Sequence, residues 1–454
     1  MRGEQQEHLQ TVPHLTKRSK GRMKKLLLSL LLLCLAAEGK SQDSLFYLIR
    51  EAITEDSLVR EEMRFNRDGL FMPLRGIIQT FTHRDFNQLS SPYPKSSSHW
   101  EDYGLALSPL AATWVMKACG VESRSTTQRM LTANGLAGGL TVGLSQLLRQ
   151  TVSEARPDGS DNNSFPSTEA ALAFMGATML SREYGHISPW ITIGGYTAAT
   201  GTQMLRVGHN AHWMNDIFMG AGIGVVSTQL AYFLTDKIIG ENGIRRMPLS
   251  TSEQAQLMAW DNQPSGFRLI SGTETNGRSL DITDFAEAAP GFDMTGITLR
   301  TSASITAGFE AEWFLNDNFY LSAIGRYTMS QAKLQIPDPN VTAWGEQIHI
   351  YHGNIAAGWA MPVAKGIRWG VRTLWGVRYN EGVKFQRVIE GNQMGESLLN
   401  INAKLCPEGG AGIVIDMLQS HNQTVGFNID YLHTFGTRFM ANRWVFASSW
   451  KAMF

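Results

Sequence analysis

The chain has 454 residues, enough for two or three domains that each bury a core of their own. Its 40 basic and 40 acidic residues balance, so nothing in the charge favours nucleic acid as a partner. The spacing of the three cysteines matches no metal site, and a disulfide between Cys119 and Cys406, which fall in different predicted domains, is not favoured. No metal or other cofactor is therefore expected.

The N-terminal segment contains a candidate secretory signal. Residues 24–37 read KKLLLSLLLLCLAA, in which two lysines precede an apolar run that is too short to span a bilayer comfortably. Small and polar residues follow, so cleavage is expected near Ser41 or Gln42. Residues 1–22 are polar and fit poorly ahead of a secretory signal, so Met23 is a candidate translation start. Residues 1–42 are interpreted as a signal sequence with an N-terminal extension.

Residues 43–240 have the texture of a helical domain. It contains three uncharged runs, each near the length of a membrane span: Leu131–Leu148, Ile187–Leu205 and Ile217–Leu234. The first two runs are rich in Gly, Ala, Thr and Ser, and such small residues let buried helices pack closely in water or in a membrane. Length alone therefore leaves a soluble bundle and a membrane bundle both open.

A polar linker, residues 241–265, leads into a segment of strands, residues 266–454. Apolar residues alternate with polar or small ones in about eight stretches, among them Ile297–Trp313, Phe319–Met329, Ile367–Tyr379 and Val425–Phe435. A period of two with one apolar face predicts a half-buried strand. Within Ile367–Tyr379, the arginines Arg368, Arg372 and Arg378 share one parity and are expected to point inward.

Long alternating strands with aromatic ends and a terminal Phe454 resemble an outer-membrane β-barrel. A soluble antiparallel barrel or sandwich is the alternative. About eight strands leave an interior that side chains fill, so an anchor is favoured over a channel. A chain with strongly apolar membrane spans would tend to stop in the inner membrane on its way to the outer membrane. We therefore expect the helical domain to be soluble, periplasmic and tethered to the barrel. The predicted fold class is thus multidomain: an all-α helical bundle followed by an antiparallel β-barrel.

Three short blocks carry candidate chemistry, and the third, RVGHNAHWMND, is the richest. His212 and Asp216 are four residues apart, so on a helix they share one face. An Asp near one imidazole nitrogen fixes the tautomer and leaves the other nitrogen free to attack. Arg206, six residues before His212, can hold a phosphoryl group with paired hydrogen bonds. A buried His with a satisfied Asp is the plainer interpretation.

The other two blocks add cations and a helix start. RQTVSEARP supplies Arg149 and Arg156, and the Arg-Pro pair is expected to end a helix and place Arg156 beside a loop. SFPSTEA places Pro166 and Ser167 before an Ala-rich stretch, which predicts a helix N-terminus able to bind phosphate. A solvated arginine cluster and an ordinary helix cap are the plainer interpretations.

Together, the order and spacing of the three blocks resemble the type 2 phosphatidic acid phosphatase and haloperoxidase family, over about 70 residues. The resemblance implies that His212 is the nucleophile, forming a phosphohistidine, and that Asp216 orients it. It also implies that the phosphate is held by five side chains: Arg149, Arg156, Ser167, Thr168 and Arg206. Such groups stabilise the charge of the transition state.

Four positions depart from the family pattern. Arg149 replaces a lysine and keeps its charge, and Leu205 replaces a serine. Thr168 replaces a glycine, which narrows the space for an oxyanion. Glu169 replaces the histidine that serves in the family as general acid to the leaving group. Burial would raise the pKa of Glu169, but nearby arginines would lower it, and an ionised carboxylate would repel phosphate.

The sequence therefore predicts a phosphatase acting on a phosphomonoester or lipid (pyro)phosphate through His212, with Glu169 weakening or replacing the general acid. Its expected partners are a phosphorylated small molecule or lipid head group and the outer membrane. The alternative is a catalytically inactive phosphate- or phospholipid-binding module anchored by the barrel. Vanadate-dependent halide oxidation, which shares such a site, is a third interpretation.

Overall fold

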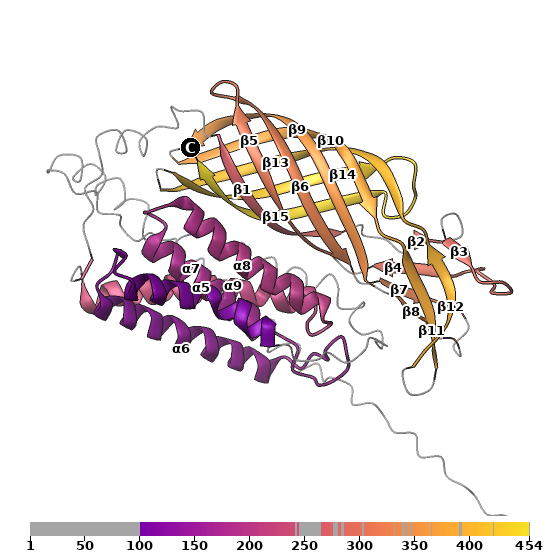
Figure 1. The fold of residues 1–454 in the computed structure, drawn as a ribbon, viewed down its shortest axis with the longest axis horizontal. Coiled ribbons are helices and arrows are strands. Elements are labelled where there is room, and N and C mark those ends of the chain that lie inside the picture. The colour runs from indigo at the N-terminus through magenta and orange to yellow at the C-terminus, as the bar shows by residue number, and fades with distance from the viewer. Residues whose placement is uncertain are drawn as a thin grey trace, which may run out of the picture.

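The computed structural model describes residues 100–240, 243–244 and 265–453, apart from short gaps at 276–279, 283–285, 302–303, 331, 338–340, 342, 346, 365, 390–392 and 421. The predicted signal sequence, residues 43–99 of the helical domain and most of the linker lie outside the described residues. The described residues form a helical bundle followed by a closed β-barrel, as predicted (Figure 1).

Five helices of the described chain form the bundle: α5 (Trp100–Ala118), α6 (Thr127–Thr151), α7 (Thr168–Tyr184), α8 (Pro189–Gly208) and α9 (Met214–Ile239). Their ends follow local rules of capping. The Ser167 hydroxyl accepts a hydrogen bond from the Ala170 backbone N–H at 3.3 Å and so begins α7. Ser188 caps α8, whose first residue is Pro189, a position where the missing N–H costs nothing.

Helix α9 lies against α7 at very short range, because glycines stand at the contact. A Cβ atom on Gly220 would lie 2.2 Å from the carbonyl oxygen of Ser167, and one on Gly224 would lie 2.1 Å from that of Ala171. The close approach fixes the first turn of α7 relative to α9. Of the helices in the described chain, α9 alone is long and apolar enough to cross a membrane, and 78% of its apolar window is buried in the structure.

The barrel is antiparallel, in the order β1-β15-β14-β13-β10-β9-β6-β5, and β5 closes it on β1. Its strands are β1 (Gly266–Thr275), β5 (Ser304–Phe314), β6 (Phe319–Ser330), β9 (Ile348–Ala364), β10 (Ile367–Asn380), β13 (Lys404–Ser420), β14 (Gln423–Thr434) and β15 (Asn442–Met453). The predicted eight-stranded barrel is confirmed. The expected strand Ile297–Trp313 is wrong in one respect: the chain divides there between β5 and β4, which belongs to another sheet.

The two ends of the barrel differ. At one end, short turns at 315–318, 365–366 and 421–422 join neighbouring strands, and both termini of the barrel lie there. At the other end, longer connections form two small sheets. These hold β2 (Leu280–Asp281), β3 (Ala286–Ala288), β4 (Thr298–Thr301), β7 (Ala332–Gln335), β8 (Ala343–Gly345), β11 (Val383–Ile389) and β12 (Gln393–Ile401). Short turns at one end and long loops at the other are typical of outer-membrane barrels.

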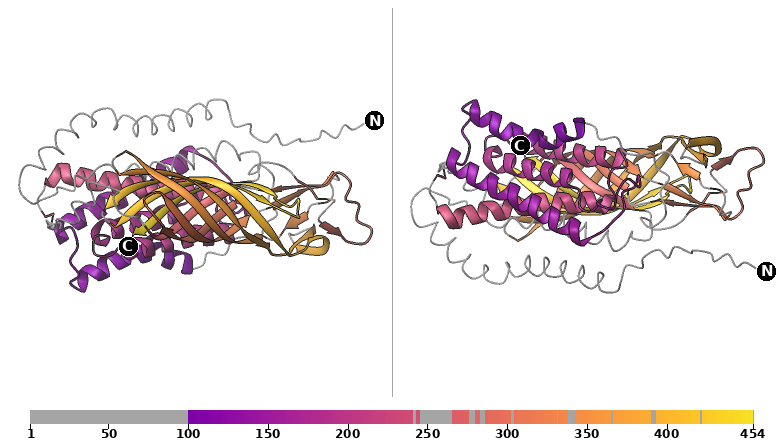
Figure 2. Two further views of the ribbon diagram at one scale, coloured as in Figure 1. Left: turned by 90° about the horizontal axis from the view of Figure 1, so that it is seen from above. Right: turned by 90° about the horizontal axis from the view of Figure 1, so that it is seen from below.

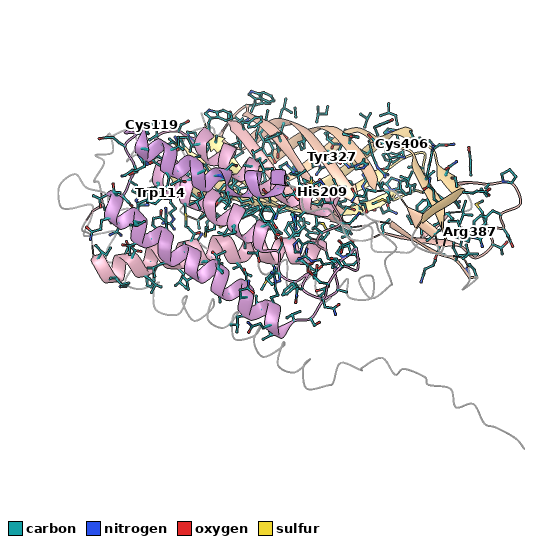
Figure 3. The ribbon with its side chains drawn as sticks, turned by 60° about the horizontal axis from the view of Figure 1, so that its bottom comes forward. Trp114, Cys119, His209, Tyr327, Arg387 and Cys406 are labelled. Carbon is teal, nitrogen blue, oxygen red and sulfur yellow. The ribbon has the colours of Figure 1, made fainter. Side chains whose placement is uncertain are left out.

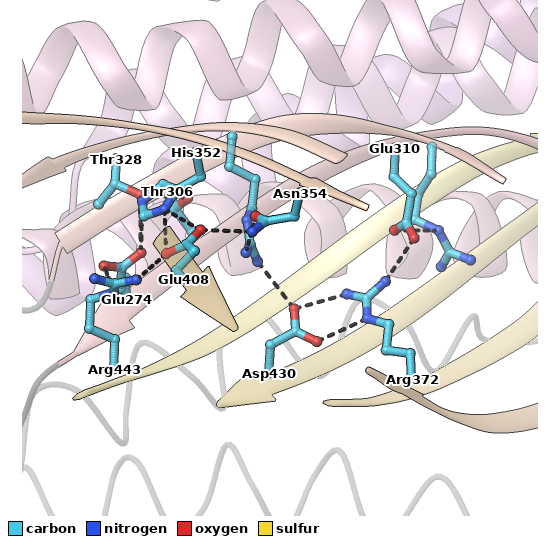
Figure 4. A network of polar contacts seen from close by, with 12 residues as sticks. Glu274, Thr306, Glu310, Thr328, His352, Asn354, Arg372, Glu408, Asp430 and Arg443 are labelled. Atoms are coloured by element: carbon cyan, nitrogen blue, oxygen red, sulfur yellow. Dashed lines mark hydrogen bonds and ion pairs between the residues drawn. The ribbon is translucent and has the colours of Figure 1, made fainter. Parts of the chain in front are cut away.

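The interior of the barrel is filled by ion pairs, as Figure 4 shows. Arg372 pairs with Asp430 at 2.8 Å and with Glu310 at 2.8 Å, and Arg268 pairs with Asp416 at 2.6 Å. The predicted inward direction of Arg368, Arg372 and Arg378 is confirmed, because their exposed fractions are 2%, 3% and 0%. A barrel packed with paired charges has no open lumen among the described residues.

The outward face is apolar and carries aromatic side chains near both ends. Trp313 and Phe319, beside a short turn, are 51% and 54% exposed. On the side of the long connections, Tyr351 packs against Tyr379 and Tyr431 packs against Trp444, with ring centroids 6.2 Å and 5.1 Å apart. Two aromatic bands around an apolar wall are typical of a barrel that spans a membrane.

The bundle lies side by side with the barrel rather than beyond its end (Figures 1 and 2). Helix α8 follows the outer wall over β15, β1 and β5. Tyr196 stacks on Trp450 at a centroid distance of 4.1 Å, and Ser271 donates a hydrogen bond to Gln203 at 3.1 Å. The outward-facing Leu269 is only 2% exposed as a result. The bundle thus covers a strip of the wall that would otherwise face outward.

Candidate active site

The predicted site residues gather at one end of the bundle. Arg149 ends α6, Ser167 begins α7, Arg206 lies in the last turn of α8, and His212 stands in the loop before α9. These four chain ends meet because α6 and α8 run toward this end and α7 and α9 start from it. The three sequence blocks are therefore one cluster in space.

His212 is completely buried and has a defined tautomer. Its Nδ1–H donates a hydrogen bond to the carbonyl oxygen of Ser164 at 2.8 Å, and a carbonyl can only accept. The Asp216 carboxylate lies 3.7 Å from the same nitrogen. Asp216 also accepts from the Ser164 hydroxyl and, at 2.9 Å, from the Trp213 backbone N–H. Nδ1 is thus held by backbone and carboxylate together, while Nε2 faces the site.

Glu169 occupies the space in front of that nitrogen. Its Oε2 atom lies 3.3 Å from His212 Nε2, and its Oε1 atom accepts a hydrogen bond from Arg206 Nη2 at 3.1 Å. The carboxylate is thus held between the guanidinium of Arg206 and the Nε2 nitrogen of His212. Its side chain is 12% exposed, the histidine 0%. Access to His212 therefore passes Glu169.

Arg206 is buried between two carboxylates. Its Nη1 donates to Asp102 Oδ2 at 2.9 Å, and His209 Nδ1 lies 3.1 Å from the same oxygen. The Nε of Arg206 is buried and makes no hydrogen bond within the described part of the chain. A buried guanidinium nitrogen without an acceptor is costly unless a ligand supplies one. This geometry suits Arg206 to an incoming oxyanion.

Arg149 and Arg156 reach the site from the other side. Arg149 Nη2 donates to Thr168 Oγ1 at 2.9 Å and to the Pro166 carbonyl at 3.2 Å. Its Nε is buried and has no acceptor among the described atoms. Arg156 donates from Nε to Asp161 at 2.9 Å and from Nη1 to the Ala211 carbonyl at 3.2 Å, beside His212. Both guanidinium groups border the cluster, and both residues are half-buried.

The start of α7 links these groups. The Ser167 backbone N–H donates to the Asp216 carbonyl at 3.0 Å, which ties α7 to α9. The Ser167 hydroxyl lies 3.3 Å from Glu169 Oε2. Thr168, where the family has glycine, is engaged by Arg149. In this structure Ser167 caps the helix, and a bound phosphate would compete for the same hydroxyl.

Electrostatics favour the charged form of both His212 and Glu169. Burial of the ring opposes its charge, but hydrogen bonds and charge from Asp216 and Glu169 outweigh this and raise the pKa of His212 above its ordinary 6.5. Burial likewise opposes the charge of Glu169, but His212 and then Arg206 hold its pKa well below the ordinary 4.5. Both pKa shifts favour an ion pair between His212 and Glu169, in which Nε2 of His212 shares its proton with the carboxylate.

Sequence reasoning missed two residues that complete the cluster. Asp102, on α5, is 0% exposed and fixes Arg206, but it lies 104 positions away and in no motif. Ser164 supplies the carbonyl that sets the tautomer of His212 and a hydroxyl for Asp216. Its position in the SFPSTEA block was visible, yet a backbone carbonyl leaves no signal in residue types. A hollow on the outer wall of the barrel, lined in part by Gly325, Gly353 and Gly376, is separate from this cluster.

Residues 127–239 match the sequence model of the PAP2 superfamily, and this range includes all three blocks. Residues 127–239 form a PAP2 superfamily domain. A lipid A 1-phosphatase of Porphyromonas gingivalis is 37% identical over 197 residues, which cover 43% of this chain and 43% of that protein. The matched segment thus spans less than half the length of this relative.

The barrel resembles solved outer-membrane proteins. Neisserial surface protein A is 8% identical and matches over 42% of this chain and 97% of its own, with a TM-score of 0.25. OprG of Pseudomonas aeruginosa is 9% identical and matches over 43% of this chain and 96% of its own, with a TM-score of 0.26. The closed eight-stranded architecture itself comes from the strand pairing described above.

Proposed function

We propose that the protein is a phosphatase that releases phosphate from a phosphorylated lipid through a phosphohistidine on His212. The observation that carries this proposal is the position of His212 Nε2, which faces an anion already held by Arg206. Replacing the Glu169 carboxylate by a phosphoryl group would keep the same contacts. The printed name of the P. gingivalis relative, lipid A 1-phosphatase, supports a lipid phosphate as substrate.

The ion pair suggests how Glu169 takes over from the missing histidine. When a phosphate dianion enters, it repels the ionised Glu169 carboxylate and so favours its protonation, and in the proposed step this proton comes from Nε2 of His212. The neutral Nε2 then attacks phosphorus, and the P–O bond to the lipid breaks. The leaving oxygen takes the proton from Glu169. The carboxylate next accepts a proton from water, whose oxygen attacks phosphorus and frees His212.

The arginines stabilise the transferring group. The Nε–H donors of Arg149 and Arg206 are buried without an acceptor among the described atoms, and charge-assisted hydrogen bonds to phosphate oxygens are strong in such surroundings. Arg156, whose side chain is 17% exposed, would add a further cation. Asp216 and Ser164 keep Nδ1 protonated, so that Nε2 is the nitrogen that reacts.

The activity is tested by phosphate release from a soluble phosphomonoester by the full-length protein in detergent micelles. His212→Ala should lower the rate by roughly three orders of magnitude or more, as expected for a nucleophile. His433→Ala is the matched control, because His433 is a half-buried residue on the barrel that pairs with Asn442 and is outside the cluster. Equal rates for wild type and His212→Ala would sink the proposal.

An inactive phosphate-binding module is the second candidate, and the observation behind it is the ion pair that fills the site. If Glu169 blocked turnover, wild type would bind inorganic phosphate without hydrolysing esters. The double variant Thr168→Gly, Glu169→His would then gain activity, because it restores the family residues. A fall in activity of this double variant below an active wild type would reject the inactive module.

We further propose that the barrel anchors the protein in the outer membrane of the cell envelope. Its apolar outward face, the two aromatic bands and the filled interior support an anchor rather than a channel. The predicted periplasmic position of the helical domain is not carried into this proposal, since the bundle packs along the barrel wall. Migration of unheated and heated protein on a gel, with membrane fractionation, tests the anchor.

A further inference from the structure

Every helix of the bundle has a long uncharged stretch. No Asp, Glu, Lys, Arg or His occurs in Tyr103–Met116, Met130–Leu148, Ala170–Ser181, Pro189–Leu205 and Ile217–Thr235. At 1.5 Å per residue, Met130–Leu148 alone is ~28 Å long. A bilayer core is ~30 Å thick. The shortest of these stretches, Ala170–Ser181, is ~18 Å long, so all five helices share an uncharged middle thinner than the bilayer core, and only the longer stretches approach its thickness.

Charges gather at the two ends of the bundle. One end is the His212 cluster. At the opposite end, Arg129 on α6 pairs with Asp236 on α9, and Glu183 on α7 accepts from the Ser125 backbone N–H at 2.9 Å and from Tyr232 at 2.7 Å. Figure 3 shows Cys119 at this opposite end and His209 at the other. The middle of the bundle thus lacks charged residues in all five helices and not in a single helix alone.

The outward faces distinguish a membrane bundle from a soluble one. On α6, the exposed positions Leu131, Gly135, Gly139, Val142 and Gln146 succeed one another without a charge, and Leu131 is 62% exposed. A surface helix of a soluble protein carries charged or polar residues on its outer face. Small residues such as these glycines are typical of helices in membranes.

Helix α5 repeats the pattern. Its exposed positions carry no charge, and the exposed fractions of Leu107 and Val115 are 43% and 59%; these positions are Tyr103, Gly104, Leu107, Ala111, Val115 and Ala118. These faces point away from the other helices and from the barrel. In water they would form an unusually extended apolar patch.

The two ends of the bundle lie level with the two ends of the barrel. At the short-turn end, Thr192 near the start of α8 donates a hydrogen bond to Gln423 of β14 at 3.2 Å. At the long-connection end, Gln347 donates to the carbonyls of Val207 and Gly208 at 3.0 and 2.9 Å. Helix α8 therefore follows the barrel wall over most of its height. The uncharged layer of the bundle lies beside the apolar wall of the barrel and continues it.

We propose that the bundle is embedded in the same outer membrane as the barrel, with the outer faces of α5 and α6 against lipid acyl chains. The His212 cluster then lies at the level of the long connections, which in outer-membrane barrels face the cell exterior. The site would meet phosphates of lipids in the outer leaflet. This inference rests on the proposed location of the barrel and deepens the proposed function by naming the leaflet.

The helices of the bundle are only modestly hydrophobic, which allows the chain to pass the inner membrane before the bundle enters the outer membrane. In the described chain only α9 reaches the hydropathy of a membrane span, and 78% of its apolar window is buried, mainly against α6 and α7. The lipid-facing helices α5 and α6 contain glycine, threonine, serine and asparagine in place of continuous Leu and Ile. Such helices are weak stop signals in the inner membrane, yet in lipid their backbone groups are satisfied internally.

The first experiment measures what surrounds α5 and α6. Spin labels are placed at Leu107→Cys and Val142→Cys in the full chain, with Cys34 and Cys119 replaced by Ser, and the protein is reconstituted in phospholipid vesicles. Both labels should collide more with oxygen than with a water-soluble nickel complex. A label at Asp161→Cys, whose side chain is 44% exposed beside the site, should show the reverse. Nickel access at Leu107 and Val142 equal to that at Asp161 would overturn the inference.

The second experiment determines which end faces outward. A membrane-impermeant maleimide is added to intact cells that carry either the natural Cys119 or the pair Cys119→Ser, Asp161→Cys. Only the Asp161→Cys thiol should be labelled, and Cys119, exposed at the opposite end, should react only after the outer membrane is permeabilised. A periplasmic bundle gives no labelling of either in intact cells, and the inverse pattern also contradicts the proposal.

Neither readout depends on catalysis. Repeating both with His212→Ala should leave the labelling and collision results unchanged, even though phosphate release is lost. Failure of the phosphatase proposal is thereby separated from failure of the membrane placement.

Discussion

At the scale of single residues, Glu169 is the position that most affects the proposed phosphate-transfer reaction. The family places a histidine at this position, and a glutamate there was predicted to repel phosphate or to replace the general acid. The structure shows its carboxylate bridging Arg206 and His212, at 3.1 and 3.3 Å. In the proposed mechanism, a substrate must therefore displace or protonate this carboxylate before its phosphoryl group reaches Nε2.

Removing the charge of Glu169 should tighten the binding of anions. In Glu169→Gln, the inhibition constant for orthovanadate, a phosphate analogue, should fall by roughly tenfold, because a carboxylate near a bound anion repels it even at an intermediate dielectric. Glu154→Gln is the control, since Glu154 contacts Asn215 and is outside the ion pair. Weaker vanadate inhibition of Glu169→Gln would show that the carboxylate does not compete for the anion site.

The same variant should change the pH profile. The proposed reacting form carries the one proton that His212 and Glu169 share, and the pKa of His212 is raised, so kcat/KM of the wild type should fall with pH through a basic limb above pH 6.5. Glu169→Gln cannot take this proton, so attack then requires an already neutral Nε2, and the basic limb should be replaced by an acid limb. The plateau of kcat should fall by roughly 100-fold or more, since the general acid is lost. An unshifted limb contradicts the assignment of this proton.

At the scale of elements, the site depends on how closely α9 approaches α7. The Ser167 carbonyl and the Gly220 backbone are in contact, and Ser167 caps the helix that carries Glu169. The sequence displayed the glycines of α9 and the start of α7, but not their contact, because close approach depends on two distant segments. The hydrogen bond from the Ser167 backbone N–H to Asp216 is part of the same junction.

Gly220→Ala should therefore affect both stability and activity. The added Cβ would meet the Ser167 carbonyl at 2.2 Å, so the helices must separate, at a cost of about 1–3 kcal/mol in the free energy of unfolding. Phosphate release should fall as Ser167 moves. Gly139→Ala on α6 is the matched control, because its Cβ meets nothing within 4 Å. Thermal unfolding in micelles and phosphate release of both variants check this; equal effects would argue against the contact.

At the scale of the whole molecule, pairing of β5 with β1 closes the barrel, and charged side chains that form ion pairs occupy its interior. Alternation in the sequence predicted the strands and the inward arginines, because a period of two is a local property. The docking of the bundle on the barrel was not predictable, since it depends on pairs such as Gln203 with Ser271, which lie far apart in sequence and have common residue types. Asp102 was missed for the same reason.

The filled interior makes a prediction for the barrel. Arg372→Met leaves Glu310 and Asp430 with fewer partners in a buried site, which should lower stability by about 3–5 kcal/mol. Arg387→Met on the exposed β11 should have little effect. The temperature at which folded and unfolded forms interconvert on a gel measures this difference. An unchanged temperature for Arg372→Met would indicate that the network does not stabilise the barrel.

The most direct test of the central claim, a phosphohistidine on His212, is chemical trapping. Full-length protein is mixed briefly with a lipid phosphate that carries radioactive phosphorus and is quenched in base, where phosphohistidine survives. The account predicts an acid-labile label on the peptide that contains His212, present in wild type and absent from His212→Gln. A label on another residue, or turnover that persists in His212→Gln, would contradict it.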